Sequence, residues 1–202
     1  MKIAMIGTGN VGGNLGRRLL SSGYDVVFGV RNLEGTGLEK DAQVALVADA
    51  VAEASVVFLA VPGGVAVQAI KDLELEDKIL VDCTNPIRWD EGPVWDPPKE
   101  GSNAQAIAAA TKASVVKAFN TFGAEFHGDP ETSLGGVDVQ IASDDDAAVA
   151  VIREIAEGAG FHIVPSGGLR NAGLLENLAV LWIHLALVEK GGRERAFKLV
   201  SR

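Results

Sequence analysis

The chain has 202 residues, of which 48% are hydrophobic and 22% are charged. This length and composition favour one compact domain with a small appendage and exclude a disordered chain or a string of modules. The 18 lysines and arginines are outnumbered by 27 aspartates and glutamates, which gives a formal net charge of -9 at pH 7. Nucleic acids and anionic membrane surfaces are therefore excluded as main partners, because both attract basic surfaces.

The single cysteine and the first residues bear on the cellular compartment. Cys83 has no second cysteine to pair with, so neither an internal disulfide nor a cysteine metal cage can form. The first ten residues, MKIAMIGTGN, are neither a basic leader nor a long enough apolar run for a signal peptide. We therefore expect a cytoplasmic protein without a bound metal.

A glycine motif follows the first expected strand. Lys2–Ile6 is a short apolar run, and Asn10–Ser22 carries apolar residues at helical spacing. Between these segments, Gly7 permits a tight turn, Gly9 lets a pyrophosphate approach the backbone, and Gly12 lets helix and strand pack closely. Strand, glycine turn and helix in this order predict dinucleotide binding; a glycine turn without a ligand is the alternative.

Apolar runs and helical segments then alternate along the chain. The further expected strands are Asp25–Val30, Gln43–Val47, Ser55–Val61, Lys78–Asp82, Ser114–Phe119 and Val137–Ala142. The helices expected between them are Ala48–Ala54, Val65–Leu73, Ser102–Thr111 and Asp144–Gly158. This alternation predicts an α/β fold of the Rossmann type, doubly wound around a mostly parallel sheet.

Two segments interrupt the alternation. Cys83–Gly101 contains four prolines together with Trp89 and Trp95, and a connector of this length typically forms a lid or binding loop. Asn171–Lys190 is apolar on almost every side from Leu178 to Val188 but is shorter than a bilayer span. We interpret it as a buried or subunit-interface helix, and not as a membrane anchor.

A helix that lies on one sheet needs only one apolar stripe, so the surplus apolar face of this segment favours a homodimer. In such a dimer Glu176, Asn177 or His184 could approach the partner's site, so that the acceptor pocket is shared. Complete burial of the helix within one chain is the alternative.

Ligands of an open parallel sheet collect at the carboxyl ends of its strands. The candidate cofactor-binding residues there are Gly7, Thr8, Gly9, Asn10, Val11, Gly12, Arg31, Val61, Pro62, Asn85, Pro86 and Asn120. The carboxamides of Asn85 and Asn120 suit a ribose or a nicotinamide amide, although asparagines also occur in plain turns after strands.

Arg31 follows the second expected strand, 19 residues after Gly12. A guanidinium at this interval can pair with the 2′-phosphate of NADP, whereas NAD proteins place an acidic residue there. The sequence therefore predicts NADP over NAD. Glu34 keeps an NAD interpretation open, and a solvated surface arginine is the structural alternative.

The usual catalytic motifs do not occur. The three histidines are scattered, and neither a metal-ligand spacing nor a nucleophile elbow is present. We interpret His162 and His184 as structural, while His127 in the loop after Asn120 is a candidate substrate contact. Hydride transfer between two rings needs alignment more than a protein acid or base, so the missing motifs favour a flavin or deazaflavin acceptor.

The sequence resembles a known family. The segments GTGNVGGNLGRRL, FGVRN, VVFLAVP, VDCTNPI, VVKAFNT, VDVQIASDD and LLENLAVLWIHLAL are similar, in this order and over nearly the whole chain, to those of coenzyme F420-dependent NADP oxidoreductases. Through KAFNT the chain also resembles, more distantly, the cytosolic oxidoreductase domain of transmembrane metalloreductases.

The resemblance implies an NADP-binding Rossmann domain over residues 1–166 and a helical segment over 167–202 for the acceptor site and dimerisation. It implies hydride exchange between NADP(H) and F420, or a flavin such as FMN or FAD as co-substrate. Carried over by position, Thr8, Gly9, Asn10 and Val11 hold the pyrophosphate, Arg31 holds the 2′-phosphate, and Val61 and Pro62 lie beside the nicotinamide. Relatives often have serine before the arginine, whereas this chain has Val30.

Two other functions stay open at this stage. An NADP-dependent reductase of a small carbonyl or imine is one, although such enzymes normally continue into a long helical domain and only about 35 residues follow Pro165 here. A non-enzymatic sensor that binds a dinucleotide is the other.

Overall fold

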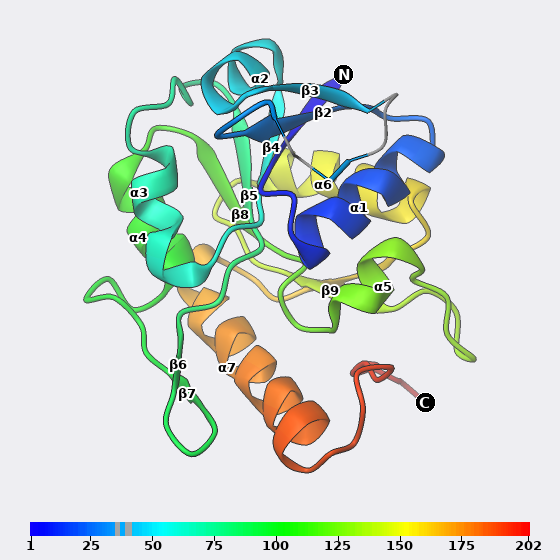
Figure 1. The fold of residues 1–202 in the computed structure, drawn as a ribbon. Helices are drawn as coiled ribbons and strands as arrows, with labels where there is room; N and C mark the ends of the chain where they lie inside the picture. Colours follow the sequence, from blue (N-terminus) through cyan, green and yellow to red (C-terminus); the bar gives the residue numbers. More distant parts are fainter. Residues whose placement is uncertain (35–36, 39–41) are drawn as a thin grey trace.

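The computed structural model describes residues 1–34, 37–38 and 42–202, and a parallel sheet forms its centre (Figure 1). Among the described residues this sheet has six strands in the order β3-β2-β1-β4-β5-β8. Their bounds are β1 Lys2–Ile6, β2 Asp25–Val30, β3 Gln43–Leu46, β4 Val56–Leu59, β5 Ile79–Asp82 and β8 Ser114–Lys117. The order reverses between β1 and β4, which confirms the predicted doubly wound Rossmann-type fold.

Helices cover both faces of this sheet, because its central strands carry apolar side chains on both sides. All four residues of β4 are fully buried, as expected for a parallel strand. One face carries α1 (Asn10–Ser21) and α6 (Asp146–Gly158), which pack around Phe28 and Phe58. The other face carries α2 (Val47–Glu53), α3 (Ala66–Ile70) and α4 (Asn103–Ala110). The helix predicted over Val65–Leu73 is shorter, since its first turn is a 3-10 helix over Gly63–Val65.

The last strands leave the main sheet. Within the described chain, β9 (Asp138–Ile141) and β10 (His162–Pro165) pair in parallel as a small second sheet. A single antiparallel bridge between Lys117 and Ala142 joins β9 to the end of β8. The short helix α5 (Ala124–Gly128) lies in the connection between β8 and β9 and packs beside α1.

The proline-rich segment contains a hairpin that the sequence did not predict. Strands β6 (Ile87–Trp89) and β7 (Pro93–Trp95) pair in antiparallel fashion. The turn between them contains Glu91 with a φ of 56°. The prolines did not prevent pairing, because Pro93 begins its strand, where its missing N–H costs no hydrogen bond of the ladder.

The chain ends with a long apolar helix and an extended tail. Helix α7 (Ala172–Ile183) continues into a π-helical turn, η3 (His184–Val188), and packs against β7 and α4. Residues 189–202 have no helix or strand and run back toward β9 (Figure 1). There the Lys198 ammonium lies 2.6 Å from the buried carboxylate of Asp138.

The expectation that this segment is shorter than a bilayer span was wrong, because Leu169–Val188 forms a helix long and apolar enough to cross a membrane by length and composition alone. Of the 18-residue window that meets this criterion, 33% is buried in the protein. Its inner side nevertheless carries a fully buried charged residue, Glu176.

Candidate functional site

The glycine turn joins β1 to α1, and two of its glycines are needed for packing. A Cβ on Gly7, whose φ is 98°, would lie 2.4 Å from the carbonyl oxygen of Ala60. A Cβ on Gly12 would lie 2.0 Å from the carbonyl oxygen of Gly7. At Gly9, in contrast, an added Cβ meets nothing within 4 Å. Gly9 is also the N-cap of α1, so amide donors at the start of the helix face open space that a pyrophosphate can fill.

A cleft of about 480 Å³ lies at the carboxyl ends of β1, β4, β5 and β8. Seven of the residues predicted from the sequence line it together: Gly9, Asn10, Val11, Val61, Pro62, Asn85 and Asn120. The turns after four strands thus form one wall, as the rule for open parallel sheets requires.

The opposite wall comes from the C-terminal helix. Ala179, Trp182, Ile183 and Leu187 line the cleft, together with Arg193 of the tail. The Arg193 guanidinium lies 2.6 Å from the Glu125 carboxylate and 5.9 Å from the centre of the Trp182 ring. Sequence reasoning missed these residues, although the apolar pattern of the helix indicated that it had more than one face to cover.

An asparagine pair closes the floor of the cleft. The Asn85 side chain donates to the Asn120 carbonyl at 3.0 Å, and the Asn120 side chain donates to Asn85 Oδ1 at 2.8 Å. Asn120 Oδ1 is buried and has no hydrogen-bond partner among the described residues. An acceptor left unpaired in a buried position fits a ligand N–H, since its desolvation is otherwise unfavourable.

Backbone strain accompanies this pair. Phe119, which directly precedes Asn120, has a φ of 58°, in the left-handed region that bulky residues avoid. Its carbonyl oxygen lies 2.9 Å from His127 Nε2, and its ring packs edge-to-face on Phe58 and Phe161. Strained residues held in this way concentrate at functional sites.

His127 is therefore structural, and its interpretation as a substrate contact was wrong. Its ring is fully buried between the carbonyl oxygens of Phe119 and Gly123. Burial lowers the pKa of His127, although the two carbonyls act in the opposite direction. The other two histidines are partly exposed, with His162 hydrogen-bonded to Asp138 and His184 3.4 Å from Glu189. The described residues include no cluster of three or more metal-ligating side chains.

The other predicted site residues lie around the cleft and not in its lining. Thr8 lies in the glycine turn between Gly7 and Gly9. Arg31 is exposed at the end of β2 and makes no ion pair with any described residue. Pro86 is buried and accepts a hydrogen bond from Asp96, at the base of the hairpin.

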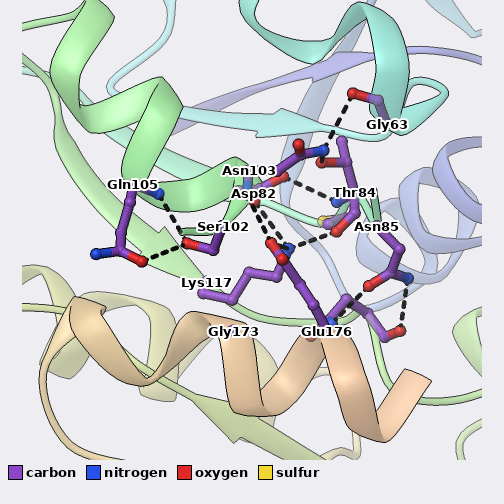
Figure 2. A network of polar contacts seen from close by, with 12 residues as sticks. Gly63, Asp82, Thr84, Asn85, Ser102, Asn103, Gln105, Lys117, Gly173 and Glu176 are labelled. Atoms are coloured by element: carbon purple, nitrogen blue, oxygen red, sulfur yellow. Dashed lines mark hydrogen bonds and ion pairs between the residues drawn. The ribbon is translucent and has the colours of Figure 1, made fainter. Parts of the chain in front are cut away.

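Below the cleft lies a buried charge network that the sequence did not reveal (Figure 2). The side chains of Lys117, Asp82 and Glu176 are all 0% exposed. Lys117 Nζ lies 2.8 Å from Asp82 and 3.1 Å from Glu176. Burial alone would lower the pKa of Lys117, but the two carboxylates outweigh burial and leave that pKa above its ordinary value. For Glu176, burial raises the pKa and Lys117 opposes that effect.

Comparison with known proteins agrees with this geometry. Residues 2–86 match the model of the coenzyme F420-dependent NADP oxidoreductase family. The chain is 31% identical over 211 residues to the F420-dependent NADP reductase of Methanothermobacter marburgensis, and the match covers 92% of each protein. The chain belongs to this family. It is an NADP-dependent oxidoreductase by this relationship, as the sequence resemblance implied.

Two further relatives fit the assignment. A protein from Arthrobacter sp. FB24, provisionally described as an F420-dependent NADP-reductase, has a crystal structure that matches with a TM-score of 0.88, 29% identity and complete coverage of both chains. Metalloreductase STEAP3 of Rattus norvegicus is 33% identical over 177 residues, which are 85% of this chain. The match spans only 35% of that longer metalloreductase.

The glycine turn can be tested by replacing Gly9 with valine. The open space around Gly9 leaves the fold intact, but the side chain fills the volume through which a pyrophosphate reaches the helix amides. If two hydrogen bonds between the pyrophosphate and these helix amides are lost, at about 1.5–3 kcal/mol each, NADPH binding weakens by at least about 100-fold. Fluorescence titration measures the affinity, Gly9→Ala gives a smaller loss, and thermal unfolding verifies the fold. Unchanged affinity in a folded Gly9→Val protein would remove this turn from the site.

Proposed function

We propose that this protein transfers hydride between NADPH and a planar ring acceptor, deazaflavin F420 or a flavin such as FMN or FAD. The observation that carries the proposal is the lining of the cleft. Among the described residues, that lining contains no carboxylate, lysine, histidine or tyrosine, and Arg193 and Cys83 are its ionisable members. Burial raises the pKa of the Cys83 thiol, so it stays neutral. A ring acceptor needs alignment in such a cleft, whereas carbonyl reduction needs a proton donor near the oxygen.

The wall made by the strand turns suits the nucleotide. Gly9 at the start of α1 would hold the pyrophosphate, and Val61 and Pro62 would lie beside the nicotinamide ring. The buried Oδ1 of Asn120 has no partner among the described residues and would accept an N–H of the nicotinamide carboxamide, which supports this orientation. The apolar wall of Trp182 and Ile183, which lines the other side of the cleft, would hold the acceptor ring against the nicotinamide.

The reaction needs little chemistry from the protein. A hydride, with both bonding electrons, leaves the reduced nicotinamide and forms the new C–H or N–H bond of the acceptor ring, and a proton from solvent completes the reduction. The protein holds the two rings in contact and excludes water from one side of each.

Turnover with defined acceptors tests the proposal. Purified protein is mixed with NADPH and, in separate reactions, F420, FMN, FAD, small carbonyls and imines, and the loss of NADPH absorbance is followed. We expect oxidation of NADPH with F420 or a flavin, because the described lining of the cleft has an apolar wall from α7 and contains no carboxylate, lysine, histidine or tyrosine. Oxidation only with a carbonyl or imine would overturn the proposal, and binding without any turnover would indicate a sensor.

Arg31 is the proposed contact to the 2′-phosphate, because its exposed guanidinium at the end of β2 is not engaged elsewhere in the described chain. Arg31→Glu should weaken NADPH binding about tenfold or more and leave NADH binding almost unchanged, since a charge-assisted contact of about 1.5–3 kcal/mol is lost. Parallel titrations with both nucleotides measure the difference, and Arg153→Glu on the surface of α6 is the matched control. Equal effects on NADPH and NADH would show that Arg31 does not discriminate.

The outer face of α7 supports a homodimer. Leu174 and Leu181 are 69% and 47% exposed, and Leu178 lies between them at helical spacing. Complete burial within one chain is thus wrong for this helix. We propose that a second copy covers this stripe of leucines, since a two-fold contact lets the helix pack on its symmetry mate.

The sequence analysis suggested that Glu176 could approach the partner's site. It cannot, because its side chain is buried against Lys117 of its own chain. A helix fixed in this way from its inner side argues against a membrane anchor.

Leu181→Asp tests the dimer. A carboxylate within the stripe opposes burial of the stripe, so the variant should sediment as a monomer or aggregate while the wild type sediments as a dimer. Sedimentation equilibrium at micromolar concentration decides the point, with Leu199→Asp in the exposed tail as the control. A monomeric wild-type protein would end the dimer proposal.

A further inference from the structure

The carboxylate of Glu176 connects α7 to three other elements. Its Oε1 atom accepts hydrogen bonds from Lys117 Nζ at 3.1 Å and from the backbone N–H of Asn103 at 2.9 Å. Its Oε2 atom accepts one from the indole N–H of Trp95 at 3.1 Å. Asn103 is the first residue of α4, and Trp95 ends the hairpin, so one side chain joins the sheet, a helix start and the hairpin to α7.

The same network continues into the wall of the cleft made by the strand turns. Lys117 Nζ donates to the carbonyl of Thr84 as well as to Asp82. The Asn103 side chain donates to Thr84 Oγ1 at 2.8 Å and to the Gly63 carbonyl at 3.1 Å. Thr84 and Gly63 both line the cleft. Figure 2 shows these contacts running from Lys117 and Asn103, the two residues bonded to Glu176, to Asp82, Thr84 and Gly63.

The opposite wall follows directly along α7. Ala179 and Ile183 stand three and seven residues after Glu176, which places them on the same side of the helix. Both line the cleft. A helix transmits a shift of one turn to the next, so the position of Glu176 determines where the apolar wall stands relative to Thr84 and Gly63.

From these contacts we propose that Glu176 is a positioning residue for hydride transfer, fixing the width of the cleft through Lys117, Asn103 and Trp95. The inference rests on the proposed function, because it concerns the gap in which the two rings lie. It assigns Glu176 no contact with either ring, since the side chain is completely buried. A buried ion pair alone is a weak source of stability, and hydrophobic replacements are often as stable, so stability does not account for the network.

Glu176→Gln tests this role directly, because both carboxylate oxygens of Glu176 accept hydrogen bonds from the described residues around them. A glutamine keeps the size but replaces one acceptor oxygen by an N–H group. That group must then face Trp95 or the pair of Asn103 and Lys117, donor against donor. The helix is expected to shift, while the glycine turn, which lies outside the network, keeps its shape.

The experiment compares three measurements on the full chain. For Glu176→Gln we expect an unchanged dissociation constant for NADPH and a changed fluorescence emission of the bound reduced nicotinamide. We also expect the kcat with the ring acceptor to fall about 10- to 100-fold, because the displaced helix no longer aligns the two rings. Glu157→Gln, an exposed ion-paired glutamate of α6, should leave all three measurements at wild-type values.

A second variant identifies the contact that matters and guards against misfolding. Trp95→Phe removes the donor at Oε2, so the double variant Glu176→Gln/Trp95→Phe should recover part of the kcat lost in Glu176→Gln. If Glu176→Gln does not fold, Trp95→Phe alone carries the test: its kcat should fall severalfold with an unchanged NADPH dissociation constant, and a wild-type kcat would overturn the proposal.

Other outcomes separate the two proposals. Wild-type values throughout for folded Glu176→Gln would overturn the positioning role, as would a loss of NADPH affinity in proportion to the loss of kcat. If the wild-type protein oxidises NADPH with none of the acceptors tested, the proposed function fails. In that case nicotinamide emission still reports on the cleft: a change in Glu176→Gln at unchanged affinity supports positioning, and no change refutes it.

Discussion

The burial of Lys117 between two carboxylates is the interaction on which the arrangement of the cleft depends. Lys117 and Asp82 are paired neighbours at the ends of β8 and β5, so the sheet itself brings them together. Glu176 adds α7 to that pair from a distant part of the chain. Each charge is expensive to bury alone, and each becomes tolerable only when the others are in place. The network therefore favours one arrangement of strands, hairpin and helix over any that separates them.

Hydrophobic burial could not position α7 in the same way. The helix is apolar on almost every side, with Leu175 and Ala179 buried and Leu174 and Leu181 exposed. An attraction that depends only on buried area does not distinguish strongly between rotations of such a helix. Hydrogen bonds are directional, so the contacts of Glu176 with Asn103 and Trp95 define which side of the helix faces the sheet. The remaining apolar side is then available for another surface.

The sequence predicted the features that depend on residues close together in the chain, and it missed those that depend on contacts between distant residues. The strand, turn and helix of residues 2–21 depend on local periodicity and on glycines within one short motif, so they were predicted almost to the residue. The asparagines and Val61 were found because strand ends meet at one edge of a parallel sheet. Glu176 lies 59 residues from Lys117 and 81 from Trp95 in sequence, and no local pattern relates them. The hairpin was missed because proline and tryptophan content resembles that of a loop until the pairing partner is known.

The two walls of the cleft thus depend on different interactions: one on local backbone packing, the other on side-chain contacts between distant parts of the chain. The wall proposed for the nucleotide is mainly backbone: a glycine turn whose shape follows from close packing of Gly7 and Gly12. The family match covers residues 2–86, which contain that turn and Arg31 but neither Asn120 nor α7. The facing wall depends on side chains of a helix held by long-range polar contacts. Under the proposed function, a change in the hairpin or in α7 alters the space beside the proposed nicotinamide position without disturbing the turn proposed for the pyrophosphate, so acceptor choice can vary on a constant nucleotide site.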